Sequence, residues 1–477
     1  MRTNRVLRNT LSMFSGQSGA HLIALLFNIY LAHVLPDAAW GRLQFAIAYV
    51  VLFMVLAEFG LHTLLIRDIA RDSSRTAGYF WNSIILKTIL SVAAGILGWI
   101  VLRGFYGAYP DKQVLVYLTG GSLLFNAWYF SISAVFIGHQ ENHIETLLFF
   151  IGKLVYVVSG VIVVMLTRDV RLVAAVFTGA ALVQCVIAFI CLMKRHRHLR
   201  FCYDRGILVH LFKQGWLFFS ISLFTTLHLK FDYVFIGYYC PDADLGYYSG
   251  AYNLVLAPII LANAFVRSMY PALAECFHKK DTLFWERVRL GFRWLAVLAF
   301  PVLFFMTIEG GRILAFVYKK SFVQGLRAMQ ILLWGQGLDF FCPFAGHILY
   351  VLDQQKKVIV ITGLSVIVNV SANFILIPLF GTVGASMAMI LSLSCMFWGY
   401  AIVLKKWFSI GTLLTQLLPP AGIAGVCCIL LILLKAHVPF WINGLLYGGV
   451  CLSLFLLFRL IRWSDVHMFS SDTHDGT

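Results

Sequence analysis

Apolar stretches of about 20 residues recur along nearly the whole chain, and each is long enough to cross a bilayer as a helix. The stretches are too long and too uniformly apolar for barrel strands, in which lipid-facing and inward-facing residues alternate. Inside lipid, helices are then the structure that satisfies every backbone hydrogen bond. With 60% hydrophobic and only 12% charged residues, the composition excludes a soluble protein. We therefore expect an all-α membrane protein with about 14 transmembrane helices.

The predicted spans begin close to the N-terminus. Arg2, Arg5 and Arg8 precede the first apolar run, as in a signal sequence. Because this run continues past Leu35 without a small-residue cleavage site, we expect an uncleaved first helix. The predicted spans are residues 10–35, 42–63, 79–102, 113–137, 144–167, 172–193, 214–239, 247–272, 294–310, 327–352, 358–379, 383–404, 412–434 and 440–458.

The formal net charge of +16 gathers on one side of the predicted membrane. Of the 37 Lys and Arg residues, 23 fall in segments on the same side as the two termini, which indicates cytoplasmic termini. The charge therefore reflects orientation, and we expect no nucleic-acid partner. The basic run 194–200 fits a contact with anionic lipid headgroups. After it, Ile207, Leu208, Leu211 and Phe212 lie at helical spacing and predict a short interfacial helix.

A six-residue motif occurs twice in the sequence. Residues 36–41 read PDAAWG and residues 241–246 read PDADLG, an offset of 205 residues that Ala46 and Ala251 also keep. Both copies lie on the outer loop between the first and second helix of a six-helix set, which indicates a duplication. Because six is even, the two sets have the same orientation and are parallel repeats about an axis along the membrane normal.

The duplication predicts three parts of the chain. Residues 1–203 form an N-lobe of six helices, and residues 204–408 form a C-lobe of six more. Residues 409–477 hold two appended helices and a cytoplasmic tail.

Ionisable side chains inside apolar spans are costly and therefore mark functional positions. The ionisable residues that we place deep in the predicted spans are five basic and three acidic residues, which predicts a cationic interior. Such an interior suits an anionic substrate and repels an organic cation. The basic residues are Lys87, Lys153, Lys230, Arg267 and Arg327, and the acidic residues are Glu58, Asp232 and Asp339.

Four of the basic residues are candidates for binding the substrate. Lys153 and Lys230 lie near mid-bilayer, where the side chain cannot snorkel to water. Arg267 lies about one turn inside its span and Lys87 about two turns from the inner face, so each could bind a ligand or snorkel. Arg327 lies at the outer end of its span and can snorkel.

The acidic residues leave alternatives open. Glu58, Asp232 and Asp339 could hold a proton or a sodium ion that drives transport, or could pair with nearby bases. Lys230 and Asp232 are two positions apart and point away from each other on a helix, so direct neutralisation is not expected. The histidines in or beside spans are expected to make helix contacts rather than to bind a ligand. They are His21, His62, His228 and His347.

Glycine and proline residues predict bends in three spans. The span 327–352 contains Gly335, Asp339 and Pro343, which predicts a kinked or broken helix that lines a cavity. Pro258 and Pro301 remove backbone hydrogen bonds from two further spans. Such bends suit a transporter that opens on alternate sides of the membrane.

The sequence contains no motif that would favour an enzyme or a cofactor-binding protein over a transporter. Asp242 and Asp244 form a DxD pair, a pattern that some glycosyltransferases use to hold a metal–nucleotide. The first copy of the repeat reads Asp37-Ala-Ala39, so we interpret the pair as part of a turn. There is no Walker-type loop, HExxH or GxSxG motif, and the ten cysteines lack CxxC spacing. We expect no catalytic residue, no metal and no cofactor.

Three motifs carry a family resemblance. Residues 232–237 read DYVFIG and lead to GYYS at 246–249, residues 373–385 read NFILIPLFGTVGA, and residues 58–60 read EFG. Over about residues 5–405 the chain resembles bacterial polysaccharide flippases. These are the oligosaccharide flippase family of the multidrug/oligosaccharidyl-lipid/polysaccharide (MOP) exporter superfamily.

The resemblance implies a V-shaped pair of six-helix lobes around a central cavity. It also implies a flippase that moves an undecaprenyl-diphosphate-linked oligosaccharide across the bacterial inner membrane for surface polysaccharides such as O-antigen. In several members an ion gradient drives the cycle, and basic residues hold the pyrophosphate. Arg267 falls where the family often places a cavity arginine. Lys153 and Lys230 have no fixed family equivalent, so their roles rest on their depth in the spans.

Other functions are weaker alternatives. A lipid II flippase of the same superfamily comes closest, and an essential gene would favour it. A drug exporter fits less well because cationic drugs need carboxylates in the cavity. A membrane glycan polymerase or ligase would carry a large outer loop with catalytic residues, and no predicted outer loop is that long.

Overall fold

The structure, a computed structural model, describes residues 19–460 apart from residues 21, 198 and 280–282. Every regular element among these residues is helical, as the apolar pattern predicts. The chain forms two compact units, residues 1–246 and residues 247–477. The boundary falls inside α10 (Asp242–Leu256), whose first turn belongs to the first unit. The predicted lobe boundaries after residues 203 and 408 rest on the sequence repeat and stay predictions.

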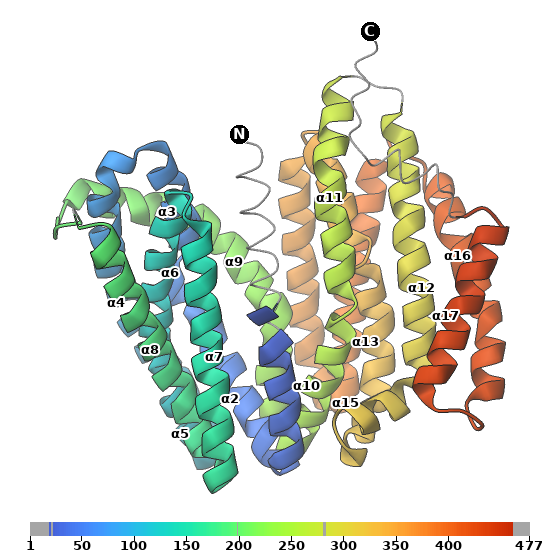
Figure 1. The fold of residues 1–477 in the computed structure, drawn as a ribbon, viewed down its shortest axis with the longest axis horizontal. Coiled ribbons are helices and arrows are strands. Elements are labelled where there is room, and N and C mark those ends of the chain that lie inside the picture. The colour runs from blue at the N-terminus through green and yellow to red at the C-terminus, as the bar shows by residue number, and fades with distance from the viewer. Residues whose placement is uncertain (1–18, 21, 198, 280–282, 461–477) are drawn as a thin grey trace. The chain divides into compact units, whose positions relative to one another are not determined.

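The first unit is a bundle of long helices joined by short turns (Figure 1). It opens with the apolar helix Leu22–Val34, and the predicted start of that span, His21 and the end of the cytoplasmic tail lie outside the described residues. The helices that follow are α2 (Asp37–Glu58), α3 (Leu61–Arg71), α4 (Thr76–Tyr106), α5 (Pro110–Gly120), α6 (Ser122–Gly138), α7 (Asn142–Thr167), α8 (Val170–Arg195) and α9 (Arg205–Tyr239).

The two copies of the repeated motif pack against each other. A Cβ on Gly41 would lie 1.7 Å from the carbonyl oxygen of Asp242, and a Cβ on Gly246 would lie 3.0 Å from the carbonyl oxygen of Asp37. Under the 205-residue offset Asp37 corresponds to Asp242 and Gly41 to Gly246. The two contacts are therefore equivalent: in each, the glycine of one copy faces the Asp carbonyl of the other copy. Glycine therefore occupies both positions because the first turns of α2 and α10 touch through their backbones.

One prediction about the first unit was wrong. The segment around Ile207 is not a separate interfacial helix, because α9 runs without interruption from Arg205 to Tyr239. The Asp204 carboxylate caps this helix by accepting hydrogen bonds from the backbone N–H groups of Gly206 and Ile207. The amphipathic residues are therefore the first turns of a 35-residue helix.

The second unit contains the remaining helices (Figure 1). The predicted bends at Pro258 and near Asp339 are breaks between helices, whereas Pro301 lies within an unbroken helix. The helices after α10 are α11 (Ile259–His278), α12 (Phe284–Val317), α13 (Leu326–Leu338), α14 (Cys342–Val351), α15 (Gln355–Leu404), α16 (Ile410–Leu434) and α17 (Phe440–Leu457).

The 50-residue helix α15 is a helical hairpin. Gly381 has φ of 57° and ψ of −132°, and the chain turns there. The Ser392 hydroxyl donates to the carbonyl of Ser365, and the hydroxyls of Thr362 and Tyr400 lie 2.9 Å apart, so the two halves are antiparallel. This turn lies between the predicted spans 358–379 and 383–404.

The predicted number of spans is confirmed. The described residues contain eleven helical segments long and apolar enough to cross a membrane, and α15 counts as two of the crossings. The helix Leu22–Val34 and the broken pair α13–α14 supply the others, which gives fourteen crossings.

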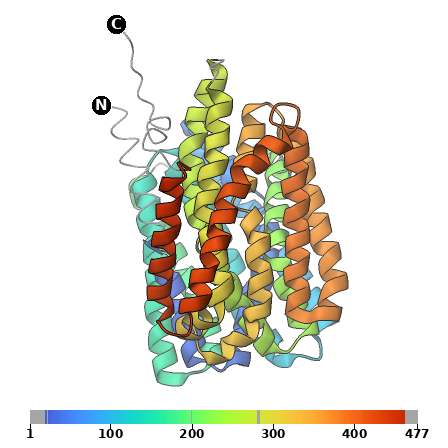
Figure 2. The same cartoon turned by 90° about the vertical axis from the view of Figure 1, so that its right-hand side faces the viewer.

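The appended helices α16 and α17 form a pair at the C-terminal end of the second unit (Figure 2). Buried polar groups hold this pair to α12. The Glu309 carboxylate on α12 is 0% exposed and accepts a hydrogen bond from Asn443 on α17 at 2.8 Å. Arg312 lies 3.3 Å from the same carboxylate and donates to the carbonyls of Lys435 and Val438 in the α16–α17 turn. This polar cluster fixes the position of the helix pair.

Replacing Asn443 by Leu should loosen this attachment. The Leu side chain keeps the volume but removes the donor to Oε1 of Glu309 and to the Leu431 carbonyl, while Arg312 still contacts Oε2 of Glu309. The expected loss is about 1–3 kcal/mol of unfolding free energy, measured by thermal unfolding in detergent. Ser453→Ala on the exposed face of the same helix is the matched control and should change little. Equal stability of the two variants would contradict the cluster's role.

Candidate functional site

Glu58 lies at a break between α2 and α3. Phe59 and Gly60 adopt positive φ values of 52° and 66°, and a Cβ on Gly60 would lie 2.5 Å from backbone atoms of Phe218 and Phe219. The Glu58 carboxylate accepts hydrogen bonds from the backbone N–H groups of Gly60, at 2.8 Å, and His62. The EFG motif therefore turns the chain and caps the first turn of α3.

The structure brings two of the predicted site residues together. Lys87 on α4 is 0% exposed, and its Nζ lies 3.8 Å from Oε1 of Glu58. In this structure Glu58 is therefore the partner of a nearby base, which is one of the two alternatives that the sequence left open.

Removing one partner of this pair should be costly. Lys87→Met leaves the Glu58 carboxylate without its cation inside the bundle, and the expected loss is about 3–5 kcal/mol of unfolding free energy. The double variant Lys87→Met/Glu58→Gln removes both charges and should recover much of this loss. Thermal unfolding in detergent distinguishes the cases, and a double variant no more stable than Lys87→Met would contradict the coupling.

A pocket of about 280 Å³ lies beside Glu58 within the first unit. Its polar lining comes from Glu58, His62 and Thr63 and from the α9 hydroxyls of Ser222 and Thr226. The pocket therefore offers a carboxylate, an imidazole and hydroxyl groups to a small polar ligand or to an ion.

Lys153 lines a second, smaller pocket of about 50 Å³ among α6, α7 and α8. Its Nζ lies 5.5 Å from the centroid of the Phe149 ring, which is cation–π distance. Asn126 and Gln184 line the same pocket, so its surface is largely polar. Lys153 is thus placed in a polar cleft of the bundle.

Lys230 and Asp232 both lie near the end of α9. The Lys230 ammonium lies 4.4 Å from the centroid of the Tyr233 ring. Asp232 is 2% exposed, and its Oδ1 accepts the backbone N–H of Tyr233 at 2.9 Å. Lys230 is therefore stabilised by an aromatic face, which leaves its N–H groups able to bind an anion.

The other two predicted residues belong to the second unit. Arg267 has an exposed side chain on α11, and Asp339 is half-buried at the C-cap of α13, where the predicted break occurs. Among the described residues, Lys153, Lys230 and Arg267 form no ion pair with a carboxylate. None of the three cations therefore has a carboxylate oxygen within ion-pair distance, although Asp232 acts electrostatically on Lys230.

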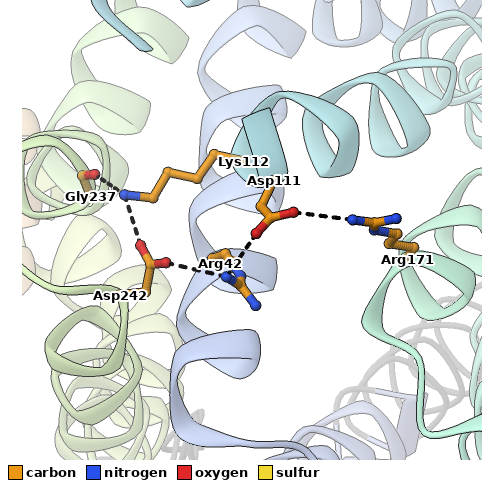
Figure 3. Close-up of polar contacts among 6 residues, drawn as sticks. All are labelled: Arg42, Asp111, Lys112, Arg171, Gly237 and Asp242. Carbon is orange, nitrogen blue, oxygen red and sulfur yellow. Dashed lines mark hydrogen bonds and ion pairs between the residues drawn. The ribbon is translucent and has the colours of Figure 1, made fainter. Parts of the chain in front are cut away.

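A charge network that no sequence motif marks lies near the starts of α2, α5, α8 and α10 in the first unit (Figure 3). Lys112 Nζ lies 2.8 Å from Asp242 and donates to the carbonyl of Gly237. Asp111 bridges Arg42, at 3.2 Å, and Arg171, at 3.1 Å. The network joins the first turns of α5, α8 and α10 to the second turn of α2. Asp242 of the DxD pair is thus an ion-pair partner at a helix start, consistent with its interpretation as part of the repeat.

The basic run 194–200 also has an internal role. Arg195 and His196 lie 2.7 Å and 3.1 Å from the carboxylate of Glu141 in the α6–α7 loop. Partial burial raises the pKa of Glu141, but the hydrogen bonds from Arg195 and His196 outweigh it and hold this pKa below its usual value. Lys194, Arg197 and Arg200 are exposed, whereas His198 is outside the described residues. The headgroup contact proposed for this run therefore rests on its exposed cations.

Comparisons with known proteins agree with this fold. Residues 6–277 match a protein family described as polysaccharide biosynthesis proteins. Over 275 residues the chain is 22% identical to a Shigella dysenteriae protein provisionally named an O-antigen transporter, a match that covers 56% of this chain and 67% of the relative.

Two solved structures place the fold among transporters. The lipid II flippase MurJ, in an inward closed conformation, has a TM-score of 0.77 at 12% identity, with 94% of this chain and 99% of MurJ covered. An inward-facing multidrug resistance MATE family transporter has a TM-score of 0.64 at 15% identity, with 81% and 96% covered. At these identities the likeness shows the fold alone, which is that of MOP-superfamily transporters. Because the family match extends over more than half of its residues, this multi-pass membrane protein belongs to the polysaccharide biosynthesis protein family.

Proposed function

We propose that the protein flips an undecaprenyl-diphosphate-linked oligosaccharide repeat unit across a bacterial inner membrane, for synthesis of a surface polysaccharide. The family match carries this proposal, and the similarity to the O-antigen transporter supports it. Lysine and arginine side chains inside a transporter fold suit a diphosphate headgroup, because charge-assisted hydrogen bonds to phosphate are strong.

The residues proposed to hold the diphosphate are Lys153, Lys230 and Arg267. Among the described residues none of the three forms an ion pair with a carboxylate, and only Lys230 has a carboxylate, that of Asp232, acting on it electrostatically. Lys87 is buried against Glu58 and would reach a substrate only if that pair opened during the cycle. The substrate would leave its fatty chain in lipid while the charged headgroup crosses between helices.

The proposed cycle is alternating access with cytoplasmic termini. The breaks at Pro258 and between α13 and α14 are positions at which helices could bend as the cavity changes sides. A coupling ion, a proton or sodium, would bind at Glu58, Asp232 or Asp339, and exposed cations of the run 194–200 would contact anionic lipids.

Deletion of the gene tests the function in cells. We expect loss of one surface polysaccharide, survival of the cells, and accumulation of the lipid-linked repeat unit in the inner leaflet. An arrest of cell-wall synthesis with accumulation of lipid II would instead identify the substrate as the peptidoglycan precursor. Unchanged surface glycans together with increased sensitivity to cationic drugs would contradict the proposal and indicate a drug exporter.

A further inference from the structure

An apolar pocket of about 190 Å³ lies among α2, α4 and α5 in the first unit. It is separate from the pockets beside Glu58 and Lys153, because no residue lines more than one of the three. The Tyr49 hydroxyl on its wall donates to the carbonyl of Gly98 at 2.6 Å and is therefore already paired. Most of the other lining residues are aliphatic, aromatic or glycine, so we expect an apolar occupant.

The pocket opens on an apolar surface of the bundle. Two of its lining residues, Trp99 of α4 and Tyr117 of α5, are 51% and 44% exposed. Ile96 and Ile100, on either side of Trp99 along α4, are also exposed. Exposed apolar side chains within a membrane span face lipid chains. The chains of the bilayer can therefore enter the pocket from the side.

Two glycines leave the interior of the pocket open. A Cβ on Gly95 or on Gly120 would meet no atom within 4 Å. A cavity of about 150 Å³ with apolar walls is enough to bind benzene, so this pocket holds a chain segment of at least about six carbon atoms. If it stayed empty, its walls would lose the dispersion contacts that a chain supplies. A lipid chain therefore stabilises the packing of α4 against α2 and α5.

A cation lies beyond the pocket on the same face of α4. Arg103 is exposed and follows Trp99 by four positions, so the two side chains are neighbours, about 6 Å apart along the helix axis. The helix ends three residues later at Tyr106, which places Arg103 at the level of the lipid headgroups. In the part of the chain that the structure describes, Arg103 forms no ion pair with a carboxylate. Its guanidinium can therefore bind a phosphate.

We propose that this pocket binds one acyl chain of an anionic phospholipid, with the lipid phosphate held by Arg103. Lipid chains are as apolar as the pocket, so burial alone does not select one lipid over another. Shape and charge do. The backbone at Gly95 and Gly120 offers a smooth wall, which an unbranched acyl chain contacts more closely than a methyl-branched isoprenoid chain. Arg103 favours a headgroup with a net negative charge. The site does not depend on the proposed flippase function.

Photolabelling tests whether the pocket is occupied. The full chain is placed in nanodiscs with a phosphatidylglycerol that carries a diazirine on one acyl chain, and mass spectrometry locates the adducts after irradiation. The pocket segments, residues 94–102 and 116–123, are compared with Leu445 and Leu452, which are exposed on α17. About ten additional dispersion contacts favour the bound chain roughly five- to thirtyfold, so labelling of the pocket should exceed that of α17 by this factor. Equal labelling of the two regions would overturn the proposal.

Filling the pocket should remove the labelling. Gly95→Leu should lower it to the level at α17, and the variant should still fold, because the new side chain enters open space and leucine favours helix over glycine. Gly179→Leu on α8 is the matched control. Its Cβ also meets no atom within 4 Å, but Gly179 does not line the pocket, so labelling should stay at the native level. Undiminished labelling in Gly95→Leu, or an equal loss in both variants, overturns the site.

Competition identifies the lipid. Unlabelled phosphatidylglycerol should reduce the labelling about two- to fivefold more than phosphatidylcholine does, as expected for one exposed charge pair. Arg103→Gln should abolish this difference, while Arg168→Gln, which replaces an exposed arginine at the end of α7, should keep it. Equal competition by the two phospholipids in the native protein overturns the role of Arg103. Stronger competition by undecaprenyl phosphate than by phosphatidylglycerol overturns the phospholipid as the occupant.

Discussion

Charge reversal at Lys153 or Lys230 is expected to abolish export of the lipid-linked glycan while leaving the protein inserted in the membrane. Each charge-assisted hydrogen bond to a diphosphate contributes about 1.5–3 kcal/mol, so its loss alone weakens binding roughly 10- to 150-fold. A glutamate adds repulsion of the diphosphate in a region of low dielectric. Arg267→Glu on α11 should act in the same direction. Surface glycan and the amount of membrane-inserted protein are measured together.

Two comparisons make this test specific. Lys153→Arg and Lys230→Arg keep the positive charge and should retain much of the export. Lys356→Glu reverses a charge at an exposed position at the start of α15 and should leave export unchanged. Full export in all three reversals, Lys153→Glu, Lys230→Glu and Arg267→Glu, would sink the assignment of these residues to the diphosphate.

Gly41→Ala should strongly destabilise the first unit. The new Cβ would lie 1.7 Å from the carbonyl oxygen of Asp242, so the backbones of α2 and α10 would have to separate. Overpacking of a buried site costs about 1–3 kcal/mol, and this contact falls at or above the upper end because no side chain can give way. Separation would also lengthen the ion pairs of Asp242 with Lys112 and Arg42. Thermal unfolding in detergent measures the loss.

The repeat provides an internal comparison for this variant. Gly246→Ala places its Cβ 3.0 Å from the Asp37 carbonyl, so a much smaller loss is expected. Gly448→Ala on α17 has no atom within 4 Å of its new Cβ and should be neutral or slightly stabilising, because alanine favours helix. Similar melting temperatures for Gly41→Ala and Gly448→Ala would contradict the close backbone contact between the two copies of the motif.

The spans were predictable from sequence because apolar runs of bilayer length have only one solution in lipid. The breaks at Pro258 and Asp339 could also be predicted, because proline and glycine interrupt helices locally. The uninterrupted course of α9 could not be predicted from the sequence. The amphipathic pattern at Ile207 is the same in a free interfacial helix and in the first turns of a longer helix. Only the Asp204 cap, a local feature of the sequence, marks the start of α9.

Which charged residues pair with each other depends on tertiary contacts, and the hydrophobic periodicity of the sequence does not predict these contacts. Lys87 and Glu58 are 29 positions apart in sequence, and only the packing of α4 against α2 brings them to 3.8 Å. Asp111 and Arg171 lie in predicted loops, where charged residues are usually solvated, and Arg42 lies at the first position of a predicted span. His62 was expected to make helix contacts, and its contact with Ser133 depends on the packing of α3 against α6.

Flipping by the purified protein tests the central claim most directly. Vesicles that contain the full chain and a fluorescent undecaprenyl-diphosphate oligosaccharide are treated with a quencher that cannot cross the membrane. The account predicts that the protein makes the inner-leaflet lipid accessible and that Lys153→Glu or Lys230→Glu prevents this. Quenching limited to the same outer-leaflet fraction as in protein-free vesicles would contradict it.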